Sequence, residues 1–284
     1  MKPGPFKYHD PKSVDDLLPL LASLEDAKLL AGGQSLMPMM NLRFVQPDHV
    51  IDLNGIEALS GIRDDDGALK VGAMTRQVTL QEDPAVAART PIIKDALKYV
   101  GHFQTRNRGT LGGSLCHLDP AAELPMLMLL YDATLKLRGE SGARDVSARE
   151  WSLAYMTPNI ALDEVLVDIE VPYWSRPHAY AFEEFARRHG DFAIVAVACL
   201  LAINEGVIRQ AAISIGGMRD TPFRLDEAES ALIGQPASAE TFKSVAAVAR
   251  AQDAATDSYI TAHYRQRLAG VLVERALIKA ASSQ

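Results

Sequence analysis

Two short segments of the sequence contain a pair of glycines followed by a serine. The first reads AGGQS at residues 31–35, and the second reads TLGGS at residues 110–114. Glycine lets successive backbone N–H groups converge on one point, and the serine adds a hydroxyl donor, so each segment is suited to hold a phosphate group. A tight turn also explains either segment by itself. Two such segments in one chain favour a ligand with two phosphate groups, as in a dinucleotide.

The common phosphate-binding motifs fit these segments poorly. Neither segment reads G-x-G-x-x-G, and neither carries the lysine of a P-loop. Asp52 lies twenty residues after Gly32, which is the spacing of a ribose-binding acid in a Rossmann unit. Because the glycine fingerprint is missing, we discount Asp52. The sequence therefore predicts a dinucleotide site that is neither of the Rossmann type nor of the NTPase type.

Cysteine and histidine give no sign of a metal site. Cys116 and Cys199 are the only cysteines, and they lie far apart in the sequence. Two thiols build neither a disulfide framework nor a four-thiolate iron–sulfur or zinc site. The seven histidines show no His-x-x-x-His spacing. We therefore expect no metal bound by this chain, so any cluster would belong to a partner.

Composition and charge describe a soluble globular protein. The chain has 284 residues, of which 48% are hydrophobic and 23% charged, and its formal charge is -7. This charge argues against nucleic-acid binding, which needs clustered lysine and arginine. The amino terminus lacks the apolar core of a signal peptide, and the longest apolar run, residues 192–203, is too short to cross a bilayer. We expect a cytoplasmic location and no transmembrane segment.

The elements around the first glycine segment predict an α/β arrangement. Ser13 is a good N-cap for a helix that runs to about Leu24. Strands are predicted at 27–31 and 49–53, and a hairpin at 61–75 turning at Asp66-Gly67. The stretch 78–100 has helical periodicity broken at Pro84 and Pro91.

A buried helix is predicted after the second glycine segment, at 120–133. Antiparallel strands are predicted at 134–139, near 144–146 and at 164–172. Pro172 and Pro177 bracket a connection, which suggests a first domain at 1–177, with subdomains at roughly 1–55 and 56–177, and a second domain at 178–284. In the second domain we predict three antiparallel strands, at 182–188, 193–203 and 207–216, and then helices from Leu225 onward.

Three longer segments resemble the signature segments of one family. They read AGGQSLMPMMNLR, QTRNRGTLGGSL with DPAAELP, and RRHGDFAIVAVA. They resemble the FAD-binding medium subunit of molybdenum hydroxylases, the family that includes bacterial carbon monoxide dehydrogenase and xanthine dehydrogenase-type enzymes. The resemblance covers essentially the whole chain. It implies an α+β fold, with a vanillyl-alcohol-oxidase-like (PCMH-type) FAD-binding domain and a small C-terminal domain of antiparallel strands and helices.

The resemblance also implies the cofactor-binding residues. In that family the two glycine segments hold the FAD diphosphate, so the site residues implied here are Ala31, Gly32, Gly33, Gln34, Ser35, Thr110, Leu111, Gly112, Gly113 and Ser114. Asp119 and Glu123 occupy positions near the adenosine part of FAD, although they are also explained as the start of a helix. Phe192 matches an aromatic residue that covers the isoalloxazine ring, although it is also explained as a core residue that opens a buried strand.

Two further features concern the flavin. Family members often carry lysine where this sequence has Glu184, and a cation there could stabilise the anionic reduced flavin. Covalent attachment needs a suitably placed histidine or cysteine, and we find no motif for it; His117 and Cys116 follow the second glycine segment, but buried roles or roles beside the diphosphate suit them better. We expect FAD to bind non-covalently.

The resemblance implies a function in electron transfer, without catalytic residues of the chain's own. Electrons from a molybdenum-cofactor large subunit would pass through iron–sulfur clusters of a small subunit to this FAD and on to an external acceptor. A heterotrimer, or a dimer of heterotrimers, would be the assembly. Two alternatives stay open. One is a self-contained FAD oxidase or reductase, with Tyr8, His102 and Tyr131 as unexcluded acid–base residues, and the other is an interaction module without flavin.

Overall fold

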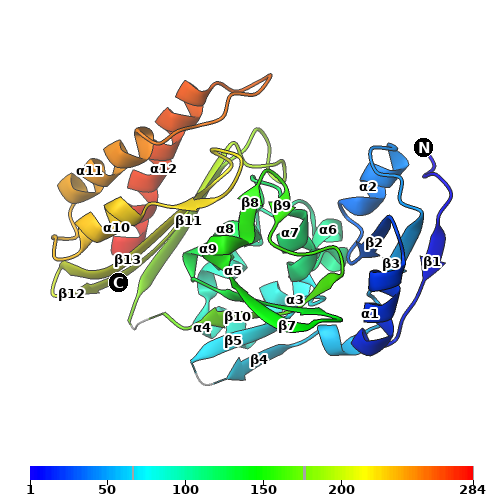
Figure 1. Ribbon diagram of the computed structural model, residues 1–284. Coiled ribbons are helices and arrows are strands. Elements are labelled where there is room, and N and C mark those ends of the chain that lie inside the picture. Colours follow the sequence, from blue (N-terminus) through cyan, green and yellow to red (C-terminus); the bar gives the residue numbers. More distant parts are fainter. Residues whose placement is uncertain (66, 175–176, 284) are drawn as a thin grey trace.

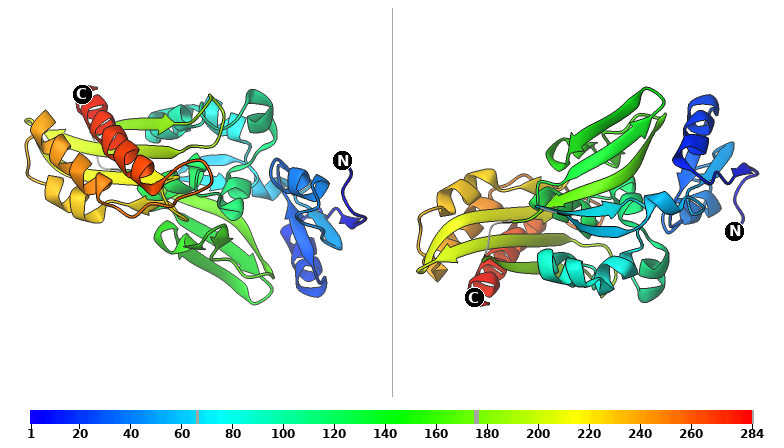
Figure 2. Two further views of the ribbon diagram at one scale, coloured as in Figure 1. Left: turned by 90° about the horizontal axis from the view of Figure 1, so that it is seen from above. Right: turned by 90° about the horizontal axis from the view of Figure 1, so that it is seen from below.

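The computed structural model places three groups of elements in a row (Figure 1). It describes residues 1–65, 67–174 and 177–283. The N-terminal elements and the C-terminal helices lie at opposite ends of the molecule, with the remaining elements between them (Figure 2). Helices and antiparallel sheets are mixed along the chain, so the fold class is α+β, as predicted.

A small parallel sheet forms the N-terminal end of the molecule. Its strand order is β1-β3-β2, and both pairings are parallel. The strand β1 has no counterpart among the sequence predictions. Ser13 is the N-cap of α1, as predicted, and its side-chain oxygen accepts from the Asp16 N–H. The elements are β1 (Lys7–His9), α1 (Val14–Ser23), β2 (Ala27–Leu30), α2 (Leu36–Asn41) and β3 (His49–Asp52).

An antiparallel sheet in the order β4-β5-β10-β6-β7 forms the middle of the molecule. The predicted hairpin is present, since β4 pairs with β5; Asp66, in its turn, lies outside the described residues. The apolar side chains of β5, β10 and β6 point into a large core that the helices of this part cover. The strands are β4 (Ile62–Asp65), β5 (Ala68–Gly72), β6 (Thr134–Gly139), β7 (Gly142–Ser147) and β10 (Glu164–Pro172).

The helices of the middle part are short because proline and glycine interrupt them. Pro84 and Pro91 each occupy the first position of a new helix, which confirms the predicted breaks. The helix predicted from residue 120 begins only at residue 123. The elements are η1 (Glu57–Leu59), α3 (Gln77–Glu82), α4 (Pro84–Arg89), α5 (Pro91–Ala96), α6 (Phe103–Arg108), α7 (Leu111–His117), α8 (Glu123–Leu130), α9 (Ala148–Trp151), β8 (Ser152–Ala154) and β9 (Thr157–Pro158).

The C-terminal part contains an antiparallel sheet in the order β11-β12-β13-β14. β12 and β13 are joined by a turn in which Glu205 and Gly206 both have positive φ, the geometry that suits the twist of a hairpin. The first strand was predicted at 182–188 but runs from Ala179 to Phe185, because its pairing with β12 ends there. The strands are β11 (Ala179–Phe185), β12 (Val195–Asn204), β13 (Val207–Gly216) and β14 (Phe223–Arg224).

Both faces of the C-terminal sheet are covered. One face packs on α10 (Asp226–Leu232), α11 (Ala239–Arg250) and α12 (Ala262–Ala281), seen beside the sheet in Figure 1. The other face shares the core of the middle part through residues such as Phe182 and Leu200. A strand buried on both faces is apolar throughout, which explains the uninterrupted run in β12.

Candidate cofactor site

The first glycine segment turns the chain from β2 into α2. Gly33 has a φ of 72°, a conformation that glycine adopts without strain. Among the described residues, no protein group accepts from the backbone N–H groups of Gly33, Gln34 and Ser35. The hydroxyl of Ser35 makes no capping hydrogen bond. Three consecutive N–H donors and one hydroxyl are therefore available to an anionic ligand.

The second glycine segment differs from the predicted loop, because its glycines lie in the first turn of α7. Thr110 caps this helix by accepting from the Gly113 N–H at 3.0 Å. The N–H groups of Leu111 and Gly112 donate to the backbone of the preceding segment, to Thr75 O at 3.0 Å and Ala73 O at 2.8 Å. Unlike those of the first segment, the N–H groups of Leu111, Gly112 and Gly113 therefore have acceptors within the protein. The hydroxyl of Ser114 has no partner among the described residues.

Packing explains why glycine occupies position 112. A methyl group there would lie 2.6 Å from the Cβ of Ala73 and 2.7 Å from its carbonyl oxygen. The missing side chain therefore lets α7 approach the chain that follows β5. The side chain of Leu111 is also buried in the core of the middle part. Leu111 and Gly112 thus place the segment, while Gly113 and Ser114 are half-buried beside it.

The two glycine segments, about eighty residues apart in the sequence, are in contact. A methyl group on Gly32 would overlap the carbonyl oxygen of Arg108 and lie 2.8 Å from the Cα of Gly109. A methyl group on Gly113 would lie 3.4 Å from the Cβ of Ala31. The available donors of the first segment are therefore next to the start of the second. One ligand can contact both segments at once.

Asp119 and Glu123 lie just after α7. Asp119 was alternatively explained as a helix start, but α8 begins four residues later. Its carboxylate instead closes a turn by accepting from the Ala121 N–H at 2.8 Å. Glu123 is the first residue of α8 and is only 8% exposed. Burial, with a contribution from Asp119, raises the pKa of Glu123 to about 7.

Glu184, in the C-terminal sheet, is a neighbour of Glu123, in the middle part. In the sheet Glu184 is opposite Ala196, and Ala196 is opposite Gly216, which packs against Met126 of α8. Burial and the neighbouring Glu123 raise the pKa of Glu184 to about 8. Its buried Oε2 has no hydrogen-bond partner among the described residues. A protonated carboxyl group fits such surroundings better than a carboxylate does.

Glu184→Gln is expected to stabilise the chain progressively as the pH rises from about 5 to about 8. Because the folded-state pKa is raised above its usual 4.5, the folded chain holds a proton that the unfolded chain has released. The contribution of Glu184 to stability is therefore fully present below pH 4.5 and is lost as the pH approaches 8. Glutamine cannot ionise, so the difference in unfolding free energy should grow by up to about 1.4 kcal/mol per pH unit.

Urea unfolding at a series of pH values measures this difference. Glu140→Gln, at an exposed turn, is the matched control and should show a difference that does not vary with pH. A constant difference for Glu184→Gln would show that Glu184 is ionised throughout the range.

Phe192 lies on the segment between β11 and β12 and is 71% exposed. The alternative of a core residue that opens a buried strand is therefore wrong, because β12 begins at Val195. A methyl group on Gly190 would lie 3.0 Å from the carbonyl oxygen of Gly101, so the same segment also packs near the approach to α6. An aromatic side chain exposed on a braced segment can stack on a planar ligand.

Arg265 of α12 braces this segment, and the sequence predictions missed it. Its guanidinium is buried and donates to the carbonyl oxygens of Ile194, at 2.7 Å, and Gly217. It also donates to Asp257 at 2.5 Å. The signal was present in the closing segment YRQRLAGVLVERAL, where an arginine interrupts the apolar face of a helix.

The remaining candidates lie in separate surroundings. Tyr131 is 2% exposed in the central core, whereas Tyr8 is 56% exposed and donates to Asp52 at 2.6 Å. His102 packs against Gly190 instead. Burial raises the pKa of the Cys116 thiol to about 12 and lowers the pKa of His117. Within residues 1–65, 67–174 and 177–283, no cluster of histidine, cysteine or acidic residues could hold a metal ion, and no helix is long and apolar enough to span a membrane.

Comparison with known families accounts for nearly the whole chain. Residues 4–174 match the FAD binding domain in molybdopterin dehydrogenase. Residues 180–280 match the CO dehydrogenase flavoprotein C-terminal domain.

Individual relatives agree over their full lengths. The chain is 37% identical to the carbon monoxide dehydrogenase medium chain of Hydrogenophaga pseudoflava, covering 98% of this chain and 97% of that one. It is 37% identical to the 6-hydroxypseudooxynicotine dehydrogenase complex subunit alpha of Paenarthrobacter nicotinovorans, covering 99% and 96%. The structure of reconstituted CO dehydrogenase from Oligotropha carboxidovorans superimposes with a TM-score of 0.97 at 37% identity, with both chains fully covered. The chain therefore belongs to the FAD-binding medium subunits of the molybdenum hydroxylases, a family of oxidoreductase flavoproteins.

Proposed function

We propose that this chain holds FAD non-covalently between residues 31–35 and 110–114 and transfers electrons from a partner subunit to an external acceptor. The observation that supports the site most strongly is the contact between the two segments, together with the three available N–H donors of the first. A diphosphate presents several anionic oxygens, so it can accept from these N–H groups and from the hydroxyls of Ser35 and Ser114.

The two segments have different roles in this proposal. The first supplies backbone donors, since its N–H groups lack protein acceptors among the described residues. The second supplies position, because α7 is fixed by its own cap and by hydrogen bonds to the chain after β5. The half-buried Gly113 and Ser114 present the surface that faces the ligand, while the buried Thr110, Leu111 and Gly112 anchor it.

The other implied residues fit a long ligand. Asp119 follows α7 and is half-buried, which suits a carboxylate accepting from ribose hydroxyls of the adenosine part. Glu123 is buried at the start of α8. Phe192 covers one face of the isoalloxazine ring and excludes water from it. With a thiol pKa of about 12, Cys116 is a poor nucleophile, which supports non-covalent binding.

When bound, FAD supplies redox chemistry, because it takes up electrons singly or in pairs and releases them in the same way. The chain itself orients the cofactor and keeps one face of the ring dry. It needs no acid–base residue for a substrate, and the three candidates Tyr8, His102 and Tyr131 do not share one site. This arrangement favours an electron carrier over a self-contained oxidase.

Partner subunits follow from the family. Relatives are named as a medium chain and as a subunit of a dehydrogenase complex. We propose that this chain joins an iron–sulfur small subunit and a molybdenum-cofactor large subunit in a heterotrimer, or in a dimer of heterotrimers, located in the cytoplasm. The proposed division of labour places FAD on residues 1–177, with subdomains at about 1–55 and 56–177, and the supporting C-terminal domain on 178–284.

Reconstitution tests this function. The purified chain should bind FAD, with absorbance near 450 nm that is lost after acid precipitation of the protein. Co-expression with the two partner subunits should give a complex in which the organic substrate bleaches the flavin, whereas the same substrate should leave the isolated, FAD-loaded chain unbleached. Rapid bleaching of the isolated chain would favour the self-contained oxidase, and a colourless chain that takes up no FAD would favour the interaction module.

Phe192→Ala is expected to retain FAD but to increase the rate at which oxygen reoxidises the reduced flavin, by about tenfold. Phe192 is 71% exposed in the protein, so the loss of its ring should cost little stability. Phe44→Ala, a phenylalanine 79% exposed near the end of α2, is the matched control. Stopped-flow reoxidation measures the effect. Equal rates in wild type and both variants would argue against the placement of Phe192 on the ring.

A further inference from the structure

A chain of hydrogen bonds connects the two glycine segments where they meet. Tyr8 of β1 donates to Asp52, whose other carboxylate oxygen accepts from both the backbone and the side-chain amide of Asn54. The side-chain amide of Asn54 also donates to the carbonyl oxygen of Ala31, at 2.9 Å. The carbonyl end of the same side chain accepts from Arg76, at 2.5 Å. Asn54 thus contacts the first glycine segment directly.

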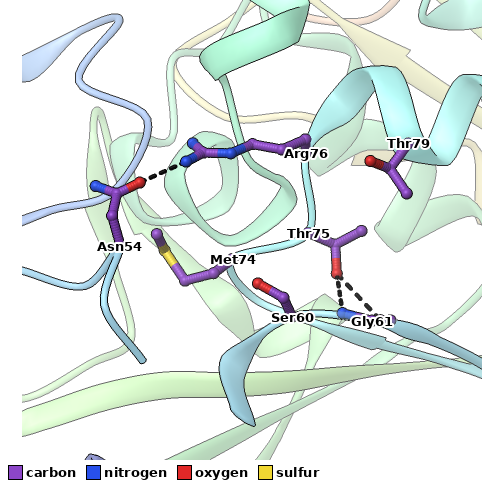
Figure 3. A pocket seen from close by; sticks show the side chains of 7 residues that line it. All are labelled: Asn54, Ser60, Gly61, Met74, Thr75, Arg76 and Thr79. Carbon is purple, nitrogen blue, oxygen red and sulfur yellow. Dashed lines mark hydrogen bonds between the residues drawn. The ribbon is translucent and has the colours of Figure 1, made fainter. Parts of the chain in front are cut away.

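Arg76 completes the connection to the backbone that leads directly into the second segment. One guanidinium nitrogen donates to Asn54, and another donates to the carbonyl oxygen of Arg108. Figure 3 shows Arg76 extended toward Asn54, beside a cavity of about 140 Å³ that also includes Met74 and Thr75. The carbonyl group of Arg108 is the same one on which Gly32 packs. Arg76 therefore holds the second segment against the first at their point of closest approach.

The positively charged guanidinium of Arg76 donates to neutral groups. In the part of the chain that the structure describes, no carboxylate forms an ion pair with it. Burial and the neighbouring Arg108 lower its pKa. The half-buried guanidinium donates to a carbonyl group and to a side-chain amide. These hydrogen bonds satisfy its N–H donors but do not add the attraction of an ion pair. The planar fork suits two acceptors on different segments, which a lysine ammonium could not bridge in the same way.

We infer that Asn54 and Arg76 are positioning residues that fix the spacing of the two glycine segments and thereby set how long FAD stays bound. The inference rests on the proposed FAD site and adds two residues that need not touch the cofactor. Without these hydrogen bonds, Ala31 and Arg108 are no longer linked through Asn54 and Arg76, and the N–H donors of residues 33–35 are no longer held in a fixed position relative to α7. The diphosphate of FAD is then bound more weakly.

The experiment compares FAD release from the full chain and its variants. Arg76→Met removes the fork and the charge, Arg76→Lys keeps only the charge, and Asn54→Ala removes the link to Ala31. We expect FAD to dissociate about tenfold faster from each of these three, with the double variant Asn54→Ala/Arg76→Met no worse than the single ones. Arg63→Met is the matched control, since Arg63 pairs with Asp168 and contacts neither glycine segment. It should release FAD at the wild-type rate.

Each outcome bears on a separate statement. Melting temperatures of the FAD-free variants should stay within about 2 °C of wild type, because the connection acts on the site and not on the core. If the FAD-free variants also melted at much lower temperatures, the two residues would stabilise the fold and not the site. If Arg76→Lys released FAD at the wild-type rate, the positive charge of Arg76, and not its two hydrogen bonds, would retain FAD. Additive effects of the two substitutions would also overturn the inference. Failure of the wild-type chain to bind FAD at all would instead refute the proposed function.

Discussion

Gly32→Ala is expected to weaken FAD binding by about 100-fold, or about 2.7 kcal/mol. The added methyl group would overlap the carbonyl oxygen of Arg108 and lie 2.8 Å from the Cα of Gly109. Both neighbours are backbone atoms, and Arg108 is held in place by Arg76. The chain cannot relieve the overlap by rotating a side chain, so the two segments must separate. Titration of the FAD-free chain with FAD, followed by flavin fluorescence, measures the loss.

The control for this substitution is Gly4→Ala. The same methyl group at Gly4 would meet only the flexible side chain of Gln46, at 3.4 Å, which is ordinary contact. Its FAD affinity should equal that of the wild type. Comparison of melting temperatures without FAD separates local from global damage, and we expect both variants to stay folded. An unchanged affinity in Gly32→Ala would mean that the segments do not act together on one ligand.

Much of the fold could be predicted because its signals are local. Pro84 and Pro91 lack the N–H of a helix interior, so each begins a helix wherever the chain packs. The strand Val195–Asn204 could be predicted from its continuous apolar run, and the turn after it from Asn204-Glu205-Gly206. Ser13 marked the start of α1 through a capping hydrogen bond within four residues.

The site was less predictable because its decisive contacts join distant residues. A glycine pair looks the same whether its N–H groups are available, as at Gly33, or used by the protein, as at Gly112. Only the arrangement of α7 against the chain after β5 decides between the two. The pairing of Glu123 with Glu184 likewise depends on a strand register across three segments. Asn54 and Arg76 belong to no motif, and their role follows only from the bonds that they make.

Arg265→Met is expected to lower the free energy of unfolding by about 3 kcal/mol. Arg265 is 8% exposed, and its guanidinium donates to the carbonyl oxygens of Ile194 and Gly217 and to Asp257. Methionine fills similar space but donates nothing, so two buried carbonyl oxygens would lose their partners. A buried acceptor without a donor costs about 1–3 kcal/mol, and the half-exposed Asp257 adds little because water solvates it.

Arg267→Met is the matched control, because Arg267 lies two residues further along the same helix with its side chain exposed. Urea unfolding of the FAD-free chains should separate the two variants, with Arg267→Met within about 0.5 kcal/mol of wild type. The effect should also reach the cofactor, since Arg265 holds the carbonyl of Ile194 two residues after Phe192. Bound flavin in Arg265→Met should therefore be reoxidised by oxygen as fast as in Phe192→Ala. If Arg265→Met lost stability but kept the wild-type rate of reoxidation, Arg265 would stabilise only the C-terminal fold. The ring of Phe192 would then keep its position without the hydrogen bond from Arg265 to Ile194.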